Sequence, residues 1–333
     1  MKRQFKNLVF EGGGVWGIAY IGMLDYLYHH GILDNITRVA GTSAGAISAC
    51  ITSFNLPFNE MKTMADSLDY QKVPGKGELL GPKIMPRALK RSLNKLFGDI
   101  DCVYRLIKQY GWYSSDYFYR WVKQQIASQF DADKKLPPYT FTDFKNPFLH
   151  KDNRHFRDLC VIGTDISNHV TRVFCYENTP HMEVAEAVRI SMSIPLFFEA
   201  IESPSIERSS DSHSNLFSDG GVMYSYPINL FDKEDPPAVT LGGMFKSELP
   251  PQPINNLVDF ISNVLACSSK VQEQLYLSSP EDLSRSIQIN TKEVSAVNFN
   301  ILTEDLTYKF LYYQGYSAAQ EFFEGTIDPD LPL

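Results

Sequence analysis

The stretch NLVFEGGGVWGIAYIGMLDYL, residues 7–27, decides the fold class of this chain. The apolar run LVF leads directly into three glycines, which predicts a short buried strand that ends in a tight turn. From Ile18 onward, apolar residues recur at helical spacing, and Gly31 fits a C-terminal cap, so a helix with one buried face is expected. The residues of that face are Ile18, Ile21, Leu24 and Tyr28.

A second stretch, ITRVAGTSAGAI at residues 36–47, repeats this pattern of strand, glycine-rich turn and helix. Alternating strands and helices are typical of an α/β domain with a parallel sheet. In such sheets, ligands and catalytic groups gather at the carboxyl ends of the strands. The two glycine-rich turns are therefore the first places to look for chemistry.

The first turn also fits a dinucleotide-binding fingerprint, because its glycines fall at positions 12, 14 and 17. Such a site needs an acidic residue at the end of the second strand, where it binds the ribose hydroxyl. Here that strand ends in Val39, Ala40 and Gly41, and the nearest acid, Asp34, precedes it. The sequence therefore disfavours nucleotide binding.

The second strand instead ends in GTSAG, residues 41–45, which matches the G-x-S-x-G nucleophile elbow. The turn is so sharp that the serine needs small neighbours, and the helix that follows favours negative charge at its start. Ser43 is the predicted nucleophile. A strand-to-helix turn that contains a serine by chance is the alternative interpretation.

Attack by a serine on an ester creates an oxyanion, which needs donors that are already in place. Successive glycines can turn their N–H groups into one concavity. Gly12, Gly13 and Gly14 are therefore predicted to form the oxyanion hole beside Ser43. The alternative is a turn that needs glycine only for tight packing.

Two kinds of base are conceivable for Ser43. A histidine-based triad is the weaker hypothesis: no downstream histidine occupies a distinctive strand end, most are expected at the surface or in loops, and none follows His213. Asp219 follows a short apolar run and precedes two glycines, so it is expected at a third strand end, although Asp-Gly is also a common hairpin turn. As a base, Asp219 needs burial to raise its pKa, which is about 3.9 in water. The downstream histidines are His150, His155, His169, His181 and His213.

Four blocks in order resemble the patatin-like phospholipase family: GGGVWG (12–17), GTSAGAI (41–47), ISMSIPLFFEAI (190–201) and DGGV (219–222). The third block carries Ser191, Ser193, Pro195 and Phe198, and it suits either the lining of an acyl pocket or core packing. The chain departs from many members at Trp16, where they carry Arg or Lys that could meet a phosphate head group. This departure bears on head-group preference.

The resemblance implies a patatin-like three-layer α/β/α fold with a mainly parallel central sheet. It implies one domain over residues 5–325, with a diverged cap-like insertion of helices and loops at 57–156 and a tail at 326–333. It also implies a Ser–Asp dyad of Ser43 and Asp219, oxyanion donors at Gly12, Gly13 and Gly14, and neither metal nor cofactor.

Composition limits the partners of the chain. A net charge of -8 and a pI near 5.4 argue against nucleic-acid binding. Five scattered cysteines, no signal peptide and no long apolar run predict a cytoplasmic protein with at most peripheral membrane contact; an effector delivered into a host cytosol would look the same.

Three segments have an open role. Residues 87–97 are expected to form a basic amphipathic helix, which either docks on anionic membrane or covers a core. The aromatic stretch 111–126 either lines a lipid cavity or belongs to the core, and the polar stretch 203–215 is a candidate gate.

A serine lipid acyl hydrolase of phospholipase A or lysophospholipase type is the leading functional hypothesis. The substrate would be a phospholipid or another acyl ester, and a requirement for a protein activator is left open. An esterase or acyltransferase on non-membrane esters is the alternative within enzymes. A non-catalytic binding module is a third hypothesis, which the intact Ser43, Asp219 and three glycines argue against.

Overall fold

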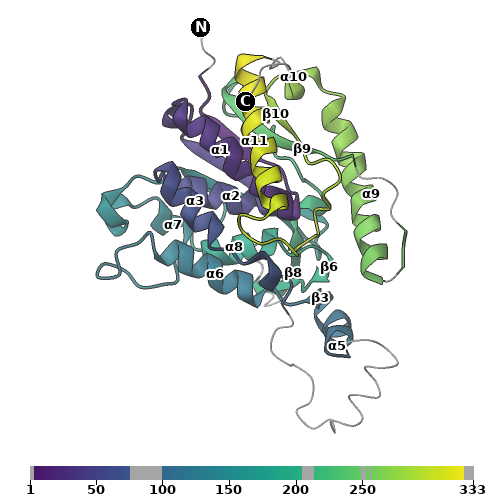
Figure 1. Ribbon diagram of the computed structural model, residues 1–333. Coiled ribbons are helices and arrows are strands. Elements are labelled where there is room, and N and C mark those ends of the chain that lie inside the picture. The colour runs from purple at the N-terminus through teal and green to yellow at the C-terminus, as the bar shows by residue number, and fades with distance from the viewer. Residues whose placement is uncertain (1–3, 76–99, 205–213, 249–252, 256, 326–333) are drawn as a thin grey trace.

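A computed structural model of the 333-residue chain describes residues 4–75, 100–204, 214–248, 253–255 and 257–325 (Figure 1). These residues form a central, mainly parallel β-sheet with helices on both faces, as the sequence predicted. The strand order of the main sheet is β10-β9-β1-β2-β4-β8-β7, and β5 also pairs with β4.

Five neighbouring strands run parallel: β10 (Ser286–Asn290), β9 (Thr240–Lys246), β1 (Asn7–Phe10), β2 (Arg38–Thr42) and β4 (Asp158–Asp165). The other three are antiparallel to their neighbours: β5 (Val170–Phe174), β7 (Ile201–Pro204) and β8 (Ser214–Asp219). Two short strands, β3 (Gly111–Tyr113) and β6 (Leu196–Phe198), pair separately.

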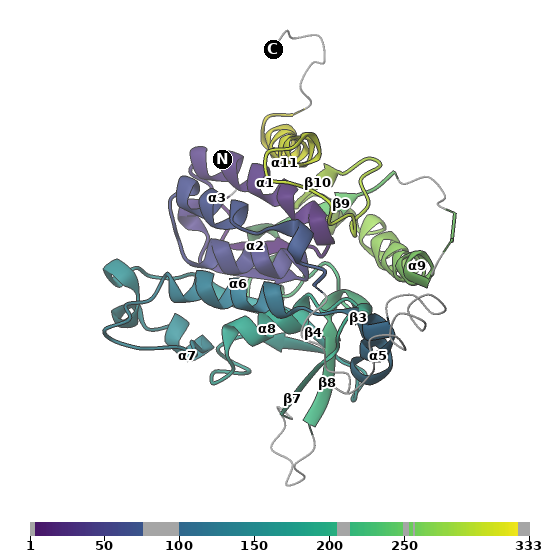
Figure 2. The ribbon, with the colours of Figure 1, turned by 60° about the horizontal axis from the view of Figure 1, so that its bottom comes forward.

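Alternation along the strands builds two cores. Leu8 and Phe10 of β1 enter the larger core, whereas Val9 between them enters a smaller one on the other face. Helices cover the larger core: α1 (Gly17–His29), α2 (Ala44–Ser53), α3 (Phe58–Asp66), α6 (Asp116–Ala127), α7 (Phe141–Phe144), α8 (Val184–Ser191) and α11 (Leu306–Glu324). Side chains of α9 (Leu257–Leu277) and α10 (Pro280–Leu283) pack against the smaller one, and α5 (Ile100–Gln109) precedes β3 (Figure 2).

Helix α1 departs from the prediction of a single buried face. It is buried on nearly all sides because α11 packs across it (Figure 1), and only its last two residues, Tyr28 and His29, are exposed. Tyr28 therefore does not belong to the buried face as predicted. The two helices cross at Gly22 and Gly315. A Cβ at Gly22 would lie 1.9 Å from the Tyr312 carbonyl oxygen, and one at Gly315 would lie 1.7 Å from that of Ala19.

Register places the strand ends that matter at one edge of the sheet. Phe10 pairs with Gly41 across β1 and β2, and Thr42 pairs with Ile162 of β4. On the other side of β4, Gly163 pairs with Asp219, the last residue of β8. The glycine turn after β1, the elbow after β2 and the Asp219 turn are therefore neighbours.

Some predictions fall outside the described residues. The basic helix at 87–97 does so entirely, as does most of the polar stretch 203–215, so membrane docking and gating stay predictions. The limits proposed for the cap-like insertion and the tail also stay predictions. Within the described ranges, no helix combines the length and apolar character needed to cross a bilayer.

Candidate active site

Ser43 occupies a strained turn between β2 and α2. Its backbone has φ 53° and ψ -124°, a conformation that side-chain-bearing residues rarely adopt and that proteins retain mainly at functional sites. The flanking glycines are required by space: a Cβ at Gly41 would lie 2.1 Å from the Gly45 carbonyl oxygen, and one at Gly45 would lie 2.3 Å from that of Phe10. Ser43 is thus fixed at the start of the ten-residue helix α2.

A segment after α8 connects this turn to β8. The Ser43 N–H donates to Ser191 Oγ at 2.8 Å. Two residues later, the Ser193 carbonyl oxygen accepts from the Asp219 N–H at 2.9 Å and from Ser218 Oγ at 2.7 Å. The third sequence block therefore holds the Ser43 and Asp219 turns at a fixed separation.

Most apolar members of this third block, among them Ile190 and Phe198, lie in the core, whereas Leu196 is exposed. The core-packing interpretation of the block is thus the one that fits. Sequence reasoning missed the role of Ser191, although two serines in an otherwise apolar run were a visible signal.

Asp219 is buried at the end of β8. Its Oδ1 accepts the Gly221 N–H at 2.7 Å, whereas Oδ2 is buried and forms no hydrogen bond of good geometry among the described residues. Burial raises the pKa of Asp219 to about 7, and the nearby Ser43 hydroxyl and the Gly221 N–H lower it in part. The hydroxyl is therefore close enough to act on the carboxyl but short of a well-formed hydrogen bond, as is common in enzymes without bound substrate.

The glycine turn lies against Ser43. A Cβ at Gly12 would lie 3.2 Å from the Ser43 Cβ. The Gly12 N–H donates to the Ser225 carbonyl oxygen at 3.0 Å, so it is not free to bind an oxyanion as predicted. Within the described part of the chain, the N–H groups of Gly13 and Gly14 have no acceptor, and Gly14 has φ +55°, which favours glycine.

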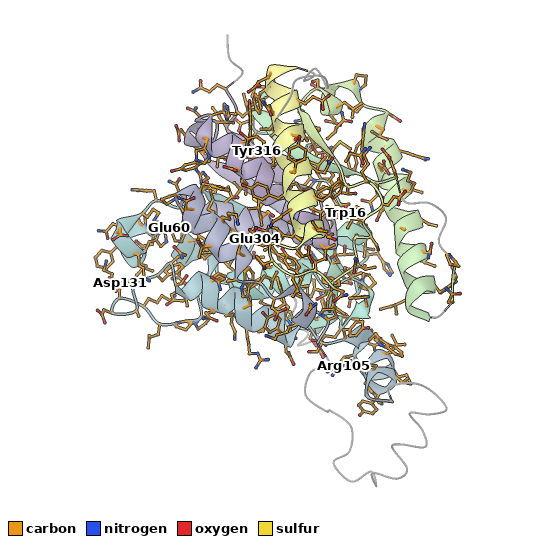
Figure 3. All side chains as sticks on the ribbon, viewed as in Figure 1. Trp16, Glu60, Arg105, Asp131, Glu304 and Tyr316 are labelled. Atoms are coloured by element: carbon orange, nitrogen blue, oxygen red, sulfur yellow. The ribbon has the colours of Figure 1, made fainter. Side chains whose placement is uncertain are left out.

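The segment after β10 braces this turn. The Val15 N–H donates to the Ala296 carbonyl oxygen at 2.9 Å, and Trp16 Nε1 donates to that of Val294 at 2.8 Å. The Trp16 ring packs against Phe245 of β9, near the centre of the view in Figure 3. Trp16 thus links the glycine turn near the start of the chain to β9 and to the segment after β10.

Glu11, which sequence reasoning did not single out, is buried at the end of β1. Its Oε2 accepts the Phe245 N–H at 2.7 Å. Burial raises the pKa of Glu11 to about 8, with a further increase from Glu273. The group is therefore mostly protonated at neutral pH and places little negative charge beside the glycine turn.

The histidine-based hypothesis finds no support in the surroundings of His150. Contrary to the expectation of a surface position, its ring is buried and stacks on Phe156. Its ring nitrogens lie 2.6 Å and 2.9 Å from the carbonyl oxygens of Arg154 and Asp143, near α7. Burial also lowers its pKa, so the ring is a packed structural element.

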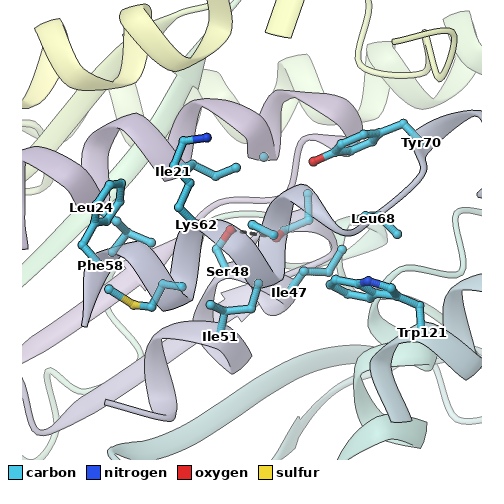
Figure 4. Close-up of a pocket in the computed structure, with 15 residues that line it drawn as sticks. Ile21, Leu24, Ile47, Ser48, Ile51, Phe58, Lys62, Leu68, Tyr70 and Trp121 are labelled. Carbon is cyan, nitrogen blue, oxygen red and sulfur yellow. Dashed lines mark hydrogen bonds between the residues drawn. The ribbon is translucent and has the colours of Figure 1, made fainter. Parts of the chain in front are cut away.

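A narrow, mostly apolar cavity starts next to the elbow (Figure 4). Between α1, α2, α3 and α6, about 550 Å³ is free of protein atoms, a volume that includes open solvent, and about 50 Å³ is accessible to the centre of a water molecule. Trp121, from the aromatic stretch 111–126, contributes to its lining, whereas Phe118, Val122 and Ile126 of that stretch belong to the core alone. The third sequence block, in contrast, contributes no residue to this cavity.

Several known proteins are similar to this chain in sequence or in fold. A family model described as Patatin-like phospholipase matches residues 8–232, more than half of the chain. An uncharacterized protein of Acanthamoeba polyphaga mimivirus is 25% identical over 325 residues, 92% of this chain and 90% of that protein. The "Probable lipid hydrolase 463L" of Invertebrate iridescent virus 6 is 23% identical over 229 residues, 68% of this chain and 63% of that protein.

Among solved structures, VipD from Legionella pneumophila matches with a TM-score of 0.57 at 18% identity, over 96% of this chain and 67% of VipD. At that identity, the likeness supports the fold alone. The family match, in contrast, covers the glycine turn, the Ser43 elbow and the Asp219 turn. The chain therefore belongs to the patatin-like phospholipase family and is a carboxylic ester hydrolase that acts on lipids.

Proposed function

We propose that this chain is a serine acyl hydrolase of phospholipase A or lysophospholipase type, with Ser43 as nucleophile and Asp219 as base. The observation that carries the proposal is the pairing of a strained Ser43 with a buried carboxyl oxygen, Asp219 Oδ2, that has no other partner among the described residues. A pKa of about 7 makes this carboxylate a far better proton acceptor than an exposed aspartate.

In the first step, Ser43 Oγ forms a bond with the carbonyl carbon of the ester, and its proton moves to Asp219 Oδ2. The carbonyl oxygen becomes an oxyanion, which the free N–H groups of Gly13 and Gly14 stabilise together with the start of α2. Gly12 keeps its bond to Ser225 and shapes the turn.

In the second step, the bond to the leaving alcohol breaks and Asp219 returns its proton to the alcohol oxygen, which leaves an acyl-Ser43 ester. Water then attacks this ester while Asp219 accepts the water proton. Collapse releases the fatty acid and returns the proton to Ser43 Oγ. Atoms and charges balance in both halves.

The test uses Ser43→Ala, Asp219→Asn and the exposed control Asp152→Asn. Fatty acid release is measured from phosphatidylcholine and lysophosphatidylcholine vesicles and from a soluble acetyl ester. We expect the first two variants to lose at least about 10³-fold in turnover while keeping their fold, and the control to match the wild type. A fluorophosphonate probe should label the wild type and Asp152→Asn, should label Asp219→Asn far more slowly because Ser43 loses its base, and should not label Ser43→Ala.

Near-normal turnover of Asp219→Asn would refute the dyad. Hydrolysis of the soluble ester alone, with no release from either lipid, would instead identify an esterase on non-membrane substrates.

A further inference from the structure

Two helices that begin beside the proposed catalytic groups present parallel stripes to the cavity. Helix α2 starts directly after Ser43, and helix α1 starts three residues after Gly14. On α2 the stripe follows the spacing i, i+3, i+4, i+7, which marks one face of a helix. Its members are Ala44, Ile47, Ser48 and Ile51; those of α1 are Gly17, Ile21 and Leu24.

The cavity therefore extends from the catalytic end of these helices along their axes. At 1.5 Å per residue, the path from Ala44 to Ile51 spans roughly 10 Å. Figure 4 shows this direction, with Tyr70 and Trp121 at one end and Leu24 and Phe58 at the other.

Phe58 closes the far end. It follows Pro57 at the start of α3, is buried, and has the rings of Tyr28 and His29 behind it, with centroids 6.3 Å and 5.7 Å away. These two residues belong to the last turn of α1 and are exposed, whereas Phe58 itself is part of the core.

One wall of the cavity contains Lys62, whose ammonium group forms ion pairs with two carboxylates. Lys62 Nζ pairs with Asp66 at 2.6 Å and with Glu304, just before α11, at 3.2 Å. The ammonium is thereby neutralised, and the methylene stem remains for the cavity. Ser48 is the other polar member, and its hydroxyl donates to the Ala44 carbonyl oxygen at 3.3 Å.

We infer that this cavity binds the acyl chain of the substrate and limits its length to about eight to ten carbons. An extended alkyl chain advances about 1.25 Å per carbon, given C–C bonds of about 1.5 Å, so roughly eight carbons span the path from Ala44 to Ile51, and Phe58 closes the cavity at that end. The inference rests on the proposed function, because it places the ester carbonyl at Ser43.

Chain-length dependence follows from burial. Each methylene that enters the apolar cavity should raise kcat/KM by roughly three- to fourfold, until the chain meets Phe58. Longer chains have to bend or stay in water, so the gain should stop at about eight to ten carbons.

Nitrophenyl esters of two to sixteen carbons provide the test. The wild type should prefer eight to ten carbons. Ser48→Leu, which fills the middle of the cavity, should lower kcat/KM on the octanoyl ester by about 100-fold relative to the acetyl ester, whose chain is too short to reach it. Phe58→Ala should move the optimum to chains about three carbons longer. Leu24→Ala widens the cavity, and its matched control Leu27→Ala removes a buried leucine of α1 that does not line it.

A second readout needs no turnover. The Ser43→Ala protein should bind decanoate by calorimetry, and Ser43→Ala with Ser48→Leu should not. The proposed limit on acyl-chain length would be wrong if an active wild type showed a flat chain-length profile, or if Ser48→Leu did not change decanoate binding. Either result would leave the dyad intact. Decanoate binding that Ser48→Leu removes, in a protein without esterase activity, would keep the cavity and refute the dyad.

Discussion

Two buried carboxyl groups face different tasks in this site. Burial raises the pKa of Asp219 to about 7 and that of Glu11 to about 8, so near neutral pH the first titrates while the second stays mostly protonated. Asp219 can therefore serve as the proposed proton acceptor, while Glu11 stays a neutral neighbour of the glycine turn. The difference should be visible as pH dependence.

Turnover should rise as pH increases through about 7, because Asp219 must lose its proton to serve as base. It should fall again above about 8, where ionised Glu11 opposes the oxyanion beside Gly13 and Gly14. A pH profile of kcat/KM on a soluble ester checks both limbs. Glu11→Gln should keep the lower limb and lose the upper one; an unchanged upper limb would remove Glu11 from this role.

Asp219 also costs stability. Its pKa is higher in the folded protein than the ordinary value of 3.8, so the folded state holds the proton more tightly, and stability falls as pH rises from about 3.8 to about 7. Asp219→Asn removes this cost. At pH 8 the free energy of unfolding of the variant should be larger by up to a few kcal/mol, at about 1.4 kcal/mol per pKa unit, and the variant should unfold at a higher temperature. At pH 4 the difference should vanish, and Asp152→Asn should change neither value.

Ser191 acts on the elbow through the backbone. Loss of its hydroxyl in Ser191→Ala leaves the Ser43 N–H without its acceptor, which should lower kcat by roughly tenfold, about 1.4 kcal/mol, with little change in KM. Ser193→Ala is the matched control, because its hydroxyl bonds to the Arg189 carbonyl oxygen inside α8. Equal effects of the two substitutions would argue for a general packing role of the segment.

These residues show where sequence reasoning stops. The candidates Ser43 and Asp219 stood out because each is framed by glycines that a sharp turn needs, and that signal is local. The contact from Ser43 to Ser191 joins residues 148 positions apart, and only the folded sheet brings them together. The sequence does not predict the hydrogen bond from the Gly12 N–H to Ser225 either. Because of this bond, only Gly13 and Gly14 keep N–H groups for the proposed oxyanion hole.

At the scale of elements, Gly22 and Gly315 allow the close crossing of α1 and α11. Helix α11 begins at Leu306, beyond the 8–232 family match, yet it covers α1, whose start carries Gly17 beside Ala44. The spacing of apolar residues predicted α1 itself. It did not predict a partner nearly three hundred residues away, although Gly22 was a hint of close approach.

Gly315→Val should therefore be strongly destabilising. Its side chain would collide with backbone at Ala19, a group that cannot turn aside, and overpacking of this kind costs about 3 kcal/mol or more. Thermal unfolding should show a midpoint several degrees lower. Tyr313→Val introduces the same β-branched residue at an exposed position of the same helix and should have a small effect. Similar midpoints for the two variants would contradict a tight crossing.

For the whole molecule, the order of strands is the decisive feature. The first strand, β1, lies in the middle of the sheet between β2 and β9, so the site combines residues from the start of the chain with the late segment that includes Ala296. Sequence patterns identified the α/β class because local periodicity encodes strands and helices. The alternation of strands and helices also gave the expectation of a parallel sheet, whereas the three-layer arrangement came from the family resemblance.

That strand order has a consequence for biosynthesis. A ribosome releases β1 early, but its partner β9 emerges some 230 residues later, roughly 10–50 s at ordinary rates of translation. The brace at Val294 and Ala296 follows later still. The glycine turn therefore cannot take its final shape before these two residues leave the ribosome, and we expect a lipid-cleaving enzyme of this design to remain inert until then.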